Sequence, residues 1–139
     1  MPATFIGDLK LQAIGSASIA PVTAPAATVT GTTVDLQLSD GSINILLITG
    51  TSAGGTSPTL AVKIQESSDN STWVDVASFA TLSGAGLDNQ FQFLGKYLRN
   101  NRYVRAHATV TGSPSALPLS VVILASKKIA GDSNGALVS

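Results

Sequence analysis

The sequence predicts an all-β protein, folded as an antiparallel β-sandwich of the jelly-roll or immunoglobulin-like kind. Three observations predict this fold. Seven segments show the residue pattern of β-strands, and turn-forming residues separate most of them. Two of these segments are apolar on both faces, as strands at the centre of a packed sheet are. No stretch of ten residues shows the periodicity of an amphipathic helix.

The chain is organised around a predicted β-hairpin over residues 59–79. In its first strand, Leu60, Val62 and Ile64 alternate with more polar side chains, so one face is expected in the core and the other in water. The next residues, 67–71 (SSDNS), are expected to turn the chain, because their short polar side chains bond to nearby backbone.

The return strand of this hairpin is expected to begin at residues 72–73. It places Val74 and Val76 on one face and Asp75 and Ala77 on the other. Trp73, the single tryptophan, falls on the face opposite to the valines. Two roles stay open for it: packing over the end of the hairpin, or contact with a partner.

The other strands are expected at residues 33–38, 43–49, 90–94, 102–110 and 119–125. The segments 43–49 (INILLIT) and 119–125 (LSVVILA) are the two that are apolar on both faces. The first suits a central position in a sheet, or a sheet face pressed on a second subunit. Residues 95–101 are expected to form a polar connection with room for one helical turn, and an eighth strand is possible in the N-terminal region.

The domain boundaries follow from this pattern. Residues 33–126 are expected to form the sandwich, and residues 127–139 a short C-terminal tail. Residues 1–32 are rich in Ala, Thr, Ser and Pro, which favours either a flexible leader or an extended N-terminal arm that orders on a neighbouring subunit. In the arm hypothesis, Phe5, Ile6 and Leu9 supply its apolar anchor.

Composition limits the possible functions. The chain has 139 residues, enough for one domain, and its eight basic and eight acidic side chains balance, which gives no net attraction to nucleic acid or to an anionic membrane. The absence of cysteine excludes disulfides and thiolate metal sites. No targeting segment is evident, and the longest apolar run, residues 121–125, is too short to cross a bilayer. Charged residues make up only 12%, which favours a protein whose surface is covered by copies or partners.

No pattern in the sequence indicates catalysis. His107 is the single histidine, and no nucleophile or orienting carboxylate accompanies it. The glycine-rich residues 50–55 are not a phosphate-binding loop, and residues 69–71 lack the ligands of a calcium loop. We therefore expect no enzyme, no cofactor and no metal.

One basic and aromatic cluster remains: Tyr97, Arg99, Arg102, Tyr103 and Arg105. Strand alternation places Tyr103 and Arg105 on one face and Arg102 on the other. A solvated or subunit-facing patch is the first hypothesis for this cluster, and contact with nucleic acid or an acidic ligand is the alternative. Together with Trp73, Tyr103 and Arg105 are the candidate interface residues of the sandwich.

Two segments, taken in order, resemble a known family. KIQESSDNSTWVDV is followed some 25 residues later by RYVRAHATVTG and then by LPLSVVILASKK. This succession over residues 62–128 is similar to that of small structural proteins of tailed bacteriophages. The resemblance leaves out the N-terminal arm and the C-terminal tail.

The resemblance implies a capsid decoration, or cement, protein. Such a protein would be a β-sandwich that assembles as a homotrimer on the outer surface of the virion and binds the major capsid protein. Two alternatives stay open: a carbohydrate- or receptor-binding β-sandwich module, and a tail or head–tail connector component. The module would need exposed aromatic rings, for which Trp73, Tyr97 and Tyr103 are the candidates.

Overall fold

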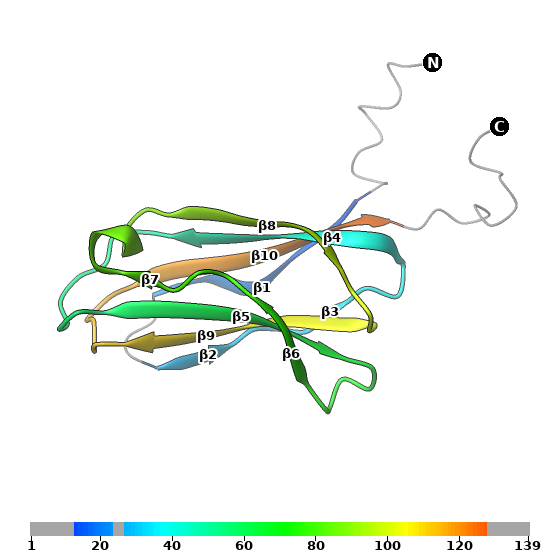
Figure 1. Ribbon diagram of the computed structural model, residues 1–139, viewed down its shortest axis with the longest axis horizontal. Coiled ribbons are helices and arrows are strands. Elements are labelled where there is room, and N and C mark those ends of the chain that lie inside the picture. The colour runs from blue at the N-terminus through cyan, green and yellow to red at the C-terminus, as the bar shows by residue number, and fades with distance from the viewer. Residues whose placement is uncertain (1–12, 24–26, 128–139) are drawn as a thin grey trace, which may run out of the picture.

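The computed structural model describes residues 13–23 and 27–127, which form two antiparallel sheets packed face to face (Figure 1). The first sheet has the order β1 (Ala13–Thr23), β10 (Pro118–Lys127), β4 (Ser39–Thr49), β8 (Phe91–Leu98). The second has the order β2 (Thr28–Thr30), β9 (Tyr103–Thr111), β5 (Thr59–Ser67), β6 (Val74–Ser78). Two short strands complete it: β3 (Val34–Asp35) pairs with β9, and β7 (Leu82–Ser83) pairs with β5 and leads into a short 3-10 helix, η1 (Gly84–Leu87).

The connections identify the sandwich as a jelly roll. β2 and β3 both pair with β9, and β6 and β7 both pair with β5, so each pair acts as one interrupted edge strand. Eight strands then remain, in the orders 1-8-3-6 and 2-7-4-5, which is the double Greek-key arrangement of a jelly roll. The predicted all-β sandwich is therefore confirmed, and of its two proposed forms the structure has the jelly roll.

The core lies between the sheets and follows the predicted alternation. Leu60, Val62 and Ile64 of β5 are buried, and so are the four residues of β9 that were expected to point inward: Val104, Ala106, Ala108 and Val110. From the other sheet, the inward-facing residues of β4 and β10 meet them: Ile43, Ile45, Leu47, Leu119, Val121 and Ile123. This apolar burial is the main stabilising term of the fold.

The expected N-terminal boundary is wrong. Instead of an arm that reaches to residue 32, Ala13–Thr23 forms β1 and Thr28–Thr30 forms β2, one in each sheet. The possible eighth strand thus exists, and β1 pairs with β10 along its length. Phe5, Ile6 and Leu9 lie outside the described residues, as do residues 128–139 of the predicted tail.

Ser18 ties the N-terminal strand to the opposite sheet. It sits at a register shift in β1, and its Oγ donates to the carbonyl of Thr32 at 2.8 Å and accepts from the backbone N–H of Ala106 at 2.9 Å. Gly31 passes so close to Ser18 that a Cβ at this position would lie 2.8 Å from the Ser18 carbonyl oxygen. Only glycine fits this contact without a backbone shift.

Two further expectations are corrected. β8 continues to Leu98, so residues 95–98 belong to a strand and not to a polar connection. In β6, Asp75 pairs with Gln65 and Ala77 with Ile64, which leaves Val76 as an extra residue. This bulge breaks the alternation: Val76 and Ala77 both pack on the core, while Val74 is 59% exposed.

Glu66 is a buried carboxylate at the end of β5. Its side chain is fully buried and accepts hydrogen bonds from the backbone N–H groups of Asn100 and Asn101, at 3.0 Å each, and from the Asn101 side chain at 3.1 Å. Nearby, Arg99 donates to the carbonyl oxygens of Leu36 and Ser39 at 2.7 and 3.0 Å. These two charged side chains satisfy the backbone of the turns that join β8 to β9 and β3 to β4.

We predict that Glu66→Ala lowers the free energy of unfolding by about 3 kcal/mol, because it leaves two backbone N–H groups without their acceptor inside the protein. Glu66→Gln should cost less, since its amide oxygen can still accept. Urea denaturation measures both, and Ser78→Ala, at an exposed position of β6, is the control. Equal losses for Glu66→Ala and Ser78→Ala would contradict the prediction.

The hairpin turn between β5 and β6 is held by Asp69. Its Oδ1 accepts from the backbone N–H groups of Thr72 and Ser71, at 2.8 and 2.9 Å, and from the Ser67 hydroxyl at 2.8 Å. These hydrogen bonds to the charged form lower the pKa of Asp69 from 3.8 to about 2, with the Thr72 and Ser71 amides as the largest causes.

This shift predicts an acid-dependent loss of stability. The folded state binds a proton at Asp69 more weakly than the unfolded chain does, so the stabilisation is complete above pH 3.8 and is lost as the pH falls towards about 2. The carboxyl chemical shift of Asp69 should therefore titrate with a midpoint near 2, and Asp69→Asn should flatten the fall of the melting temperature in this range. A midpoint near 3.8 would show that these hydrogen bonds are not maintained in solution.

Candidate protein-interaction face

The outer face of the β1–β10–β4–β8 sheet is apolar. The inward-facing residues of this sheet fill the core, but most of the described alternate residues of β4, β8 and β10 are apolar too and point away from the core. We call this surface the apolar face and define it by six residues: Leu46, Ile48, Phe91, Phe93, Val122 and Leu124. Phe91 and Phe93 are 67% and 58% exposed, and Ile48 is 40% exposed.

Strand register brings these side chains into continuous rows. Leu46 pairs with Phe93 on one side and with Val122 on the other, and Val122 pairs in turn with Ala17 of β1. In the next row, Ile48 lies between Phe91 and Ser120. Since neighbouring strands lie about 4.8 Å apart, each row is one contiguous strip across the sheet.

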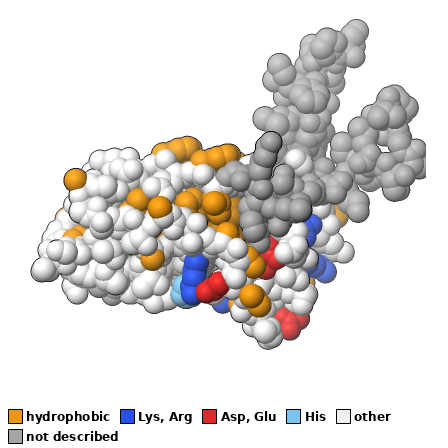
Figure 2. Space-filling view, in the orientation of Figure 1, with side chains coloured by type: hydrophobic (Ala, Val, Ile, Leu, Met, Phe, Trp, Pro, Cys, Tyr) orange, Lys and Arg blue, Asp and Glu red, His pale blue; other side chains and the backbone are white. Residues whose placement is uncertain are grey.

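No charged side chain interrupts this face at the described outward positions of β4, β8 and β10, where Asn44, Ser120 and Ser126 are the polar members. Figure 2 shows hydrophobic side chains gathered along the upper edge of the sandwich over β8, whereas charged side chains and the histidine lie lower, over the other sheet. The two outer faces of this protein therefore differ in polarity.

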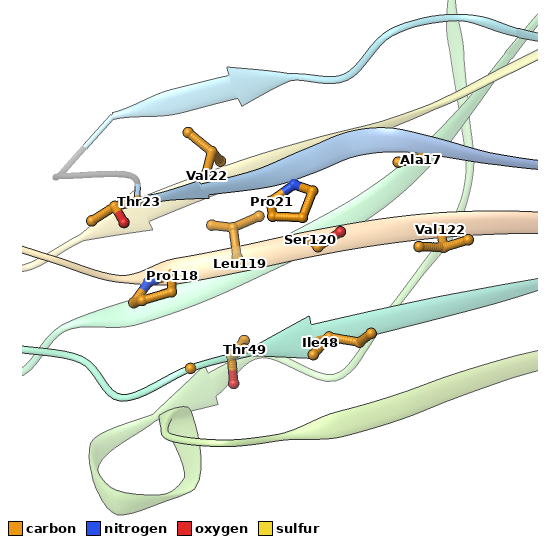
Figure 3. A pocket seen from close by; sticks show the side chains of 11 residues that line it. Ala17, Pro21, Val22, Thr23, Ile48, Thr49, Pro118, Leu119, Ser120 and Val122 are labelled. Atoms are coloured by element: carbon orange, nitrogen blue, oxygen red, sulfur yellow. The ribbon is translucent and has the colours of Figure 1, made fainter.

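A groove of about 590 Å³ opens at one end of the apolar face (Figure 3). Pro21 and Val22 of β1 stand on one side and Ile48 of β4 on the other, with the small side chain of Ser120 on β10 between them. Its lining contains no charged residue: Ala17, Pro21, Val22, Thr23, Ile48, Thr49, Gly50, Pro118, Leu119, Ser120 and Val122. Such a groove suits an apolar side chain, and it supplies no group for acid–base chemistry.

The outer face of the other sheet is a polar network. Asp75 of β6 accepts from Lys63 at 2.7 Å and from Gln65 at 2.8 Å, and Gln65 accepts from Arg105 of β9 at 2.8 Å. The bonds to Lys63 and then Gln65 lower the pKa of Asp75. Polar side chains thus pair with one another across three strands, so these side chains already have hydrogen-bonding partners within the chain.

The structure brings together two of the predicted interface residues. The Arg105 guanidinium lies over the Trp73 ring, 4.0 Å from the ring centre, and Trp73 is half-buried. Tyr103 has a different partner, since Arg102 lies over its ring at 4.9 Å. Arg102 also forms a bidentate ion pair with Asp35, at 2.8 and 2.7 Å. Arg105, Arg102 and the Arg99 already described therefore serve three separate local contacts, and not one basic patch.

His107 lies half-buried on β9 within the polar network. Its Nδ1 is 3.2 Å from the Thr30 hydroxyl, and its pKa is lowered by burial first and then by the neighbouring charges of Lys63 and Arg105. Within the described part of the chain, no group of three or more His, Cys, Asp or Glu side chains could hold a metal ion. None of the helices described there is long and apolar enough to span a bilayer.

The residues of the apolar face were only partly visible in the sequence. The pattern of residues 43–49 indicated that one face could lie against a second subunit, and this segment supplies Leu46 and Ile48. Phe91 and Phe93 were recognised as part of a strand, but their outward direction was not, because alternation alone does not tell which side of an edge strand is the core.

The chain resembles solved structures by fold. No known protein-family model matches it, and no curated protein matches it by sequence. The infectious bursal disease virus VP2 subviral particle matches with a TM-score of 0.57 at 14% identity, over 84% of this chain and 32% of the viral one. The Gt strain of that virus matches with 0.58 at 10% identity, over 86% and 38%. The PBSX exported protein XepA matches with 0.52 at 12% identity, over 84% and 37%.

These comparisons place the protein among jelly-roll β-sandwiches of the kind seen in a viral capsid protein. The chain spans about a third of the length of each of these structures. At identities of 10–14% the likeness concerns the fold alone.

We predict that Arg105→Ala changes the fluorescence of Trp73, the only tryptophan, because it uncovers one face of the indole ring. The emission maximum should move to longer wavelength, and the loss of the cation–π contact should cost about 0.5–1 kcal/mol of unfolding free energy. Arg102→Ala is the control, since it removes the equivalent contact from Tyr103 and should leave the tryptophan emission unchanged. Equal spectra for the two variants would contradict the stacking.

Proposed function

We propose that this protein is a non-enzymatic structural component of a tailed-phage virion, which decorates and stabilises the outer surface of the capsid by binding the major capsid protein as a homotrimer. The observation that carries the proposal is the apolar face: a contiguous sheet surface, on a folded jelly roll, whose described outward side chains carry no charge. In the proposed location, on the outer surface of the capsid, this face is covered by another protein surface.

The energetics favour an assembly protein. Burial of apolar surface stabilises by roughly 25 cal/mol per Å², so Phe91, Phe93 and Ile48 together represent several kcal/mol of unused burial. Large contiguous apolar patches are rare on monomeric proteins and mark sites of protein association. The sequence resemblance over residues 62–128 and the fold shared with a capsid protein both support a place in a virion.

The carbohydrate-binding alternative has less support. The guanidinium groups of Arg105 and Arg102 already lie over the rings of two candidate platform residues, Trp73 and Tyr103. Phe91 and Phe93 are exposed, but their described neighbours on the apolar face are mainly apolar and supply few groups to bind sugar hydroxyls. A tail or connector component has the same physical requirements as a decoration protein, so the experiment must separate these two locations.

The test is co-sedimentation of the purified full chain with particles of the virus whose genome encodes it. We expect saturable binding to empty heads, blocked by an excess of unlabelled protein, and no binding to isolated tails. Saturation at a multiple of three chains per site would support the trimer. Binding to tails and not to heads would overturn the decoration function, as would the absence of binding to either.

A further inference from the structure

We propose that the apolar face is covered by a second copy of this chain, with the phenylalanines of β8 in one copy seated in the groove of the next. This inference deepens the proposed function, since it rests on the self-assembly proposed there and assigns the surface that makes it. In this arrangement, the major capsid protein is bound by other surfaces of the chain.

The size of the sheet fits such an interface. Four strands at a spacing of about 4.8 Å make a sheet roughly 19 Å wide. β4 has 11 residues and β8 has 8. At about 3.4 Å per residue, the sheet is roughly 27–37 Å long. The flat area of its outer side is therefore on the order of 500–700 Å², and the apolar face is one part of this side. A standard stable interface buries about 800 Å² on each partner, so an interface centred on the apolar face would use most of this side of the sheet.

The chemistry of the face favours another copy of itself. A partner with charged side chains at this position would lose their hydration without gaining an opposite charge, because the described outward positions carry none. An identical face brings no such cost, and the chain as a whole has no net charge to oppose association. The packing of two apolar sheet faces is also the contact that already forms the core of each chain.

The shape of the face is complementary to itself in one particular way. Phe91 and Phe93 project from the β8 edge with more than half of their surface exposed. The groove lies towards the β1 edge, where Pro21 and Val22 flank the low floor at Ser120. Its volume of about 590 Å³ is within the range of pockets that enclose small-molecule-sized groups. A projection at one edge and a hollow at the other make a head-to-tail contact, which closes into a ring when the rotation between copies allows it.

The experiment measures the mass of the full chain by light scattering over a range of concentrations, for the wild type and three lysine variants. Phe91→Lys alters the projection, Val22→Lys alters the groove, and Thr28→Lys is the control. Thr28 is exposed on β2 in the other sheet, so it receives the same charge away from the apolar face. Circular dichroism and thermal melting establish that each variant is folded.

We expect the wild type and Thr28→Lys to form oligomers, with a mass at least twice the 14.1 kDa of a single chain. Phe91→Lys and Val22→Lys should fall to a single chain at the same concentration, with affinity reduced roughly 30-fold or more, as for a central aromatic anchor. A folded Phe91→Lys that still assembles like the wild type would overturn the inference.

A monomeric wild type would also overturn it, and the same variants would then identify the real occupant. If heads bind the wild type but not Phe91→Lys, the capsid protein covers the face: the proposed decoration of the capsid survives, while the homotrimer and this inference fail. If removal of residues 1–12 turns a monomer into an oligomer, the chain covers the face with its own N-terminal segment. Failure of the proposed function would appear separately, as a wild type that assembles but does not bind heads.

Discussion

The packing of the two sheets against each other is the contact on which the rest of this structure depends. Ile43, Ile45 and Leu47 from one sheet meet Val62 and Ile64 from the other, all of them almost fully buried. Because side chains alternate along a strand, this single contact determines which residues of every strand point outwards. The apolar face and the polar network are both consequences of it.

The two outer faces of the sandwich differ in whether their exposed side chains have partners within the chain. On the β5–β6–β9 side, Lys63 forms an ion pair with Asp75, and Arg105 donates a hydrogen bond to Gln65. That side is therefore a polar surface suited to contact with water. On the other side, Phe91 and Phe93 have no such compensation. The difference explains how a chain with balanced charge and only 12% charged residues can form a well-ordered sandwich and still keep exposed phenylalanines on one outer face.

The sequence was sufficient to predict the sandwich and the inward residues of β5 and β9, because regular alternation is a local signal. It was insufficient for β1, whose partner β10 lies about a hundred residues away and whose Pro-containing segment also fits a leader or an extended arm. Pro21 is accepted because β1 is an edge strand and its register shifts between Ile19 and Val22. Glu66 lies two residues after Ile64, so alternation directs both side chains inwards. A buried carboxylate is stable there because the fold brings the backbone N–H groups of Asn100 and Asn101 within hydrogen-bond distance of it. For the candidate site, alternation identified the apolar segments, and only the tertiary structure showed which of their two sides lies outside the core.

The pairing of β1 with β10 also has a consequence for how the protein is made. During synthesis β1 leaves the ribosome before the other described strands, but β10, its partner in the described sheet, leaves after all of them. β4, which is apolar on both sides, has β10 as one of its two neighbours and must wait for the same strand. The first sheet can therefore close only after Pro118–Lys127 has been translated, and contacts of such long range make folding slow. During this interval the growing chain exposes the apolar side chains of β4, and transiently exposed apolar surface makes a folding chain prone to aggregation.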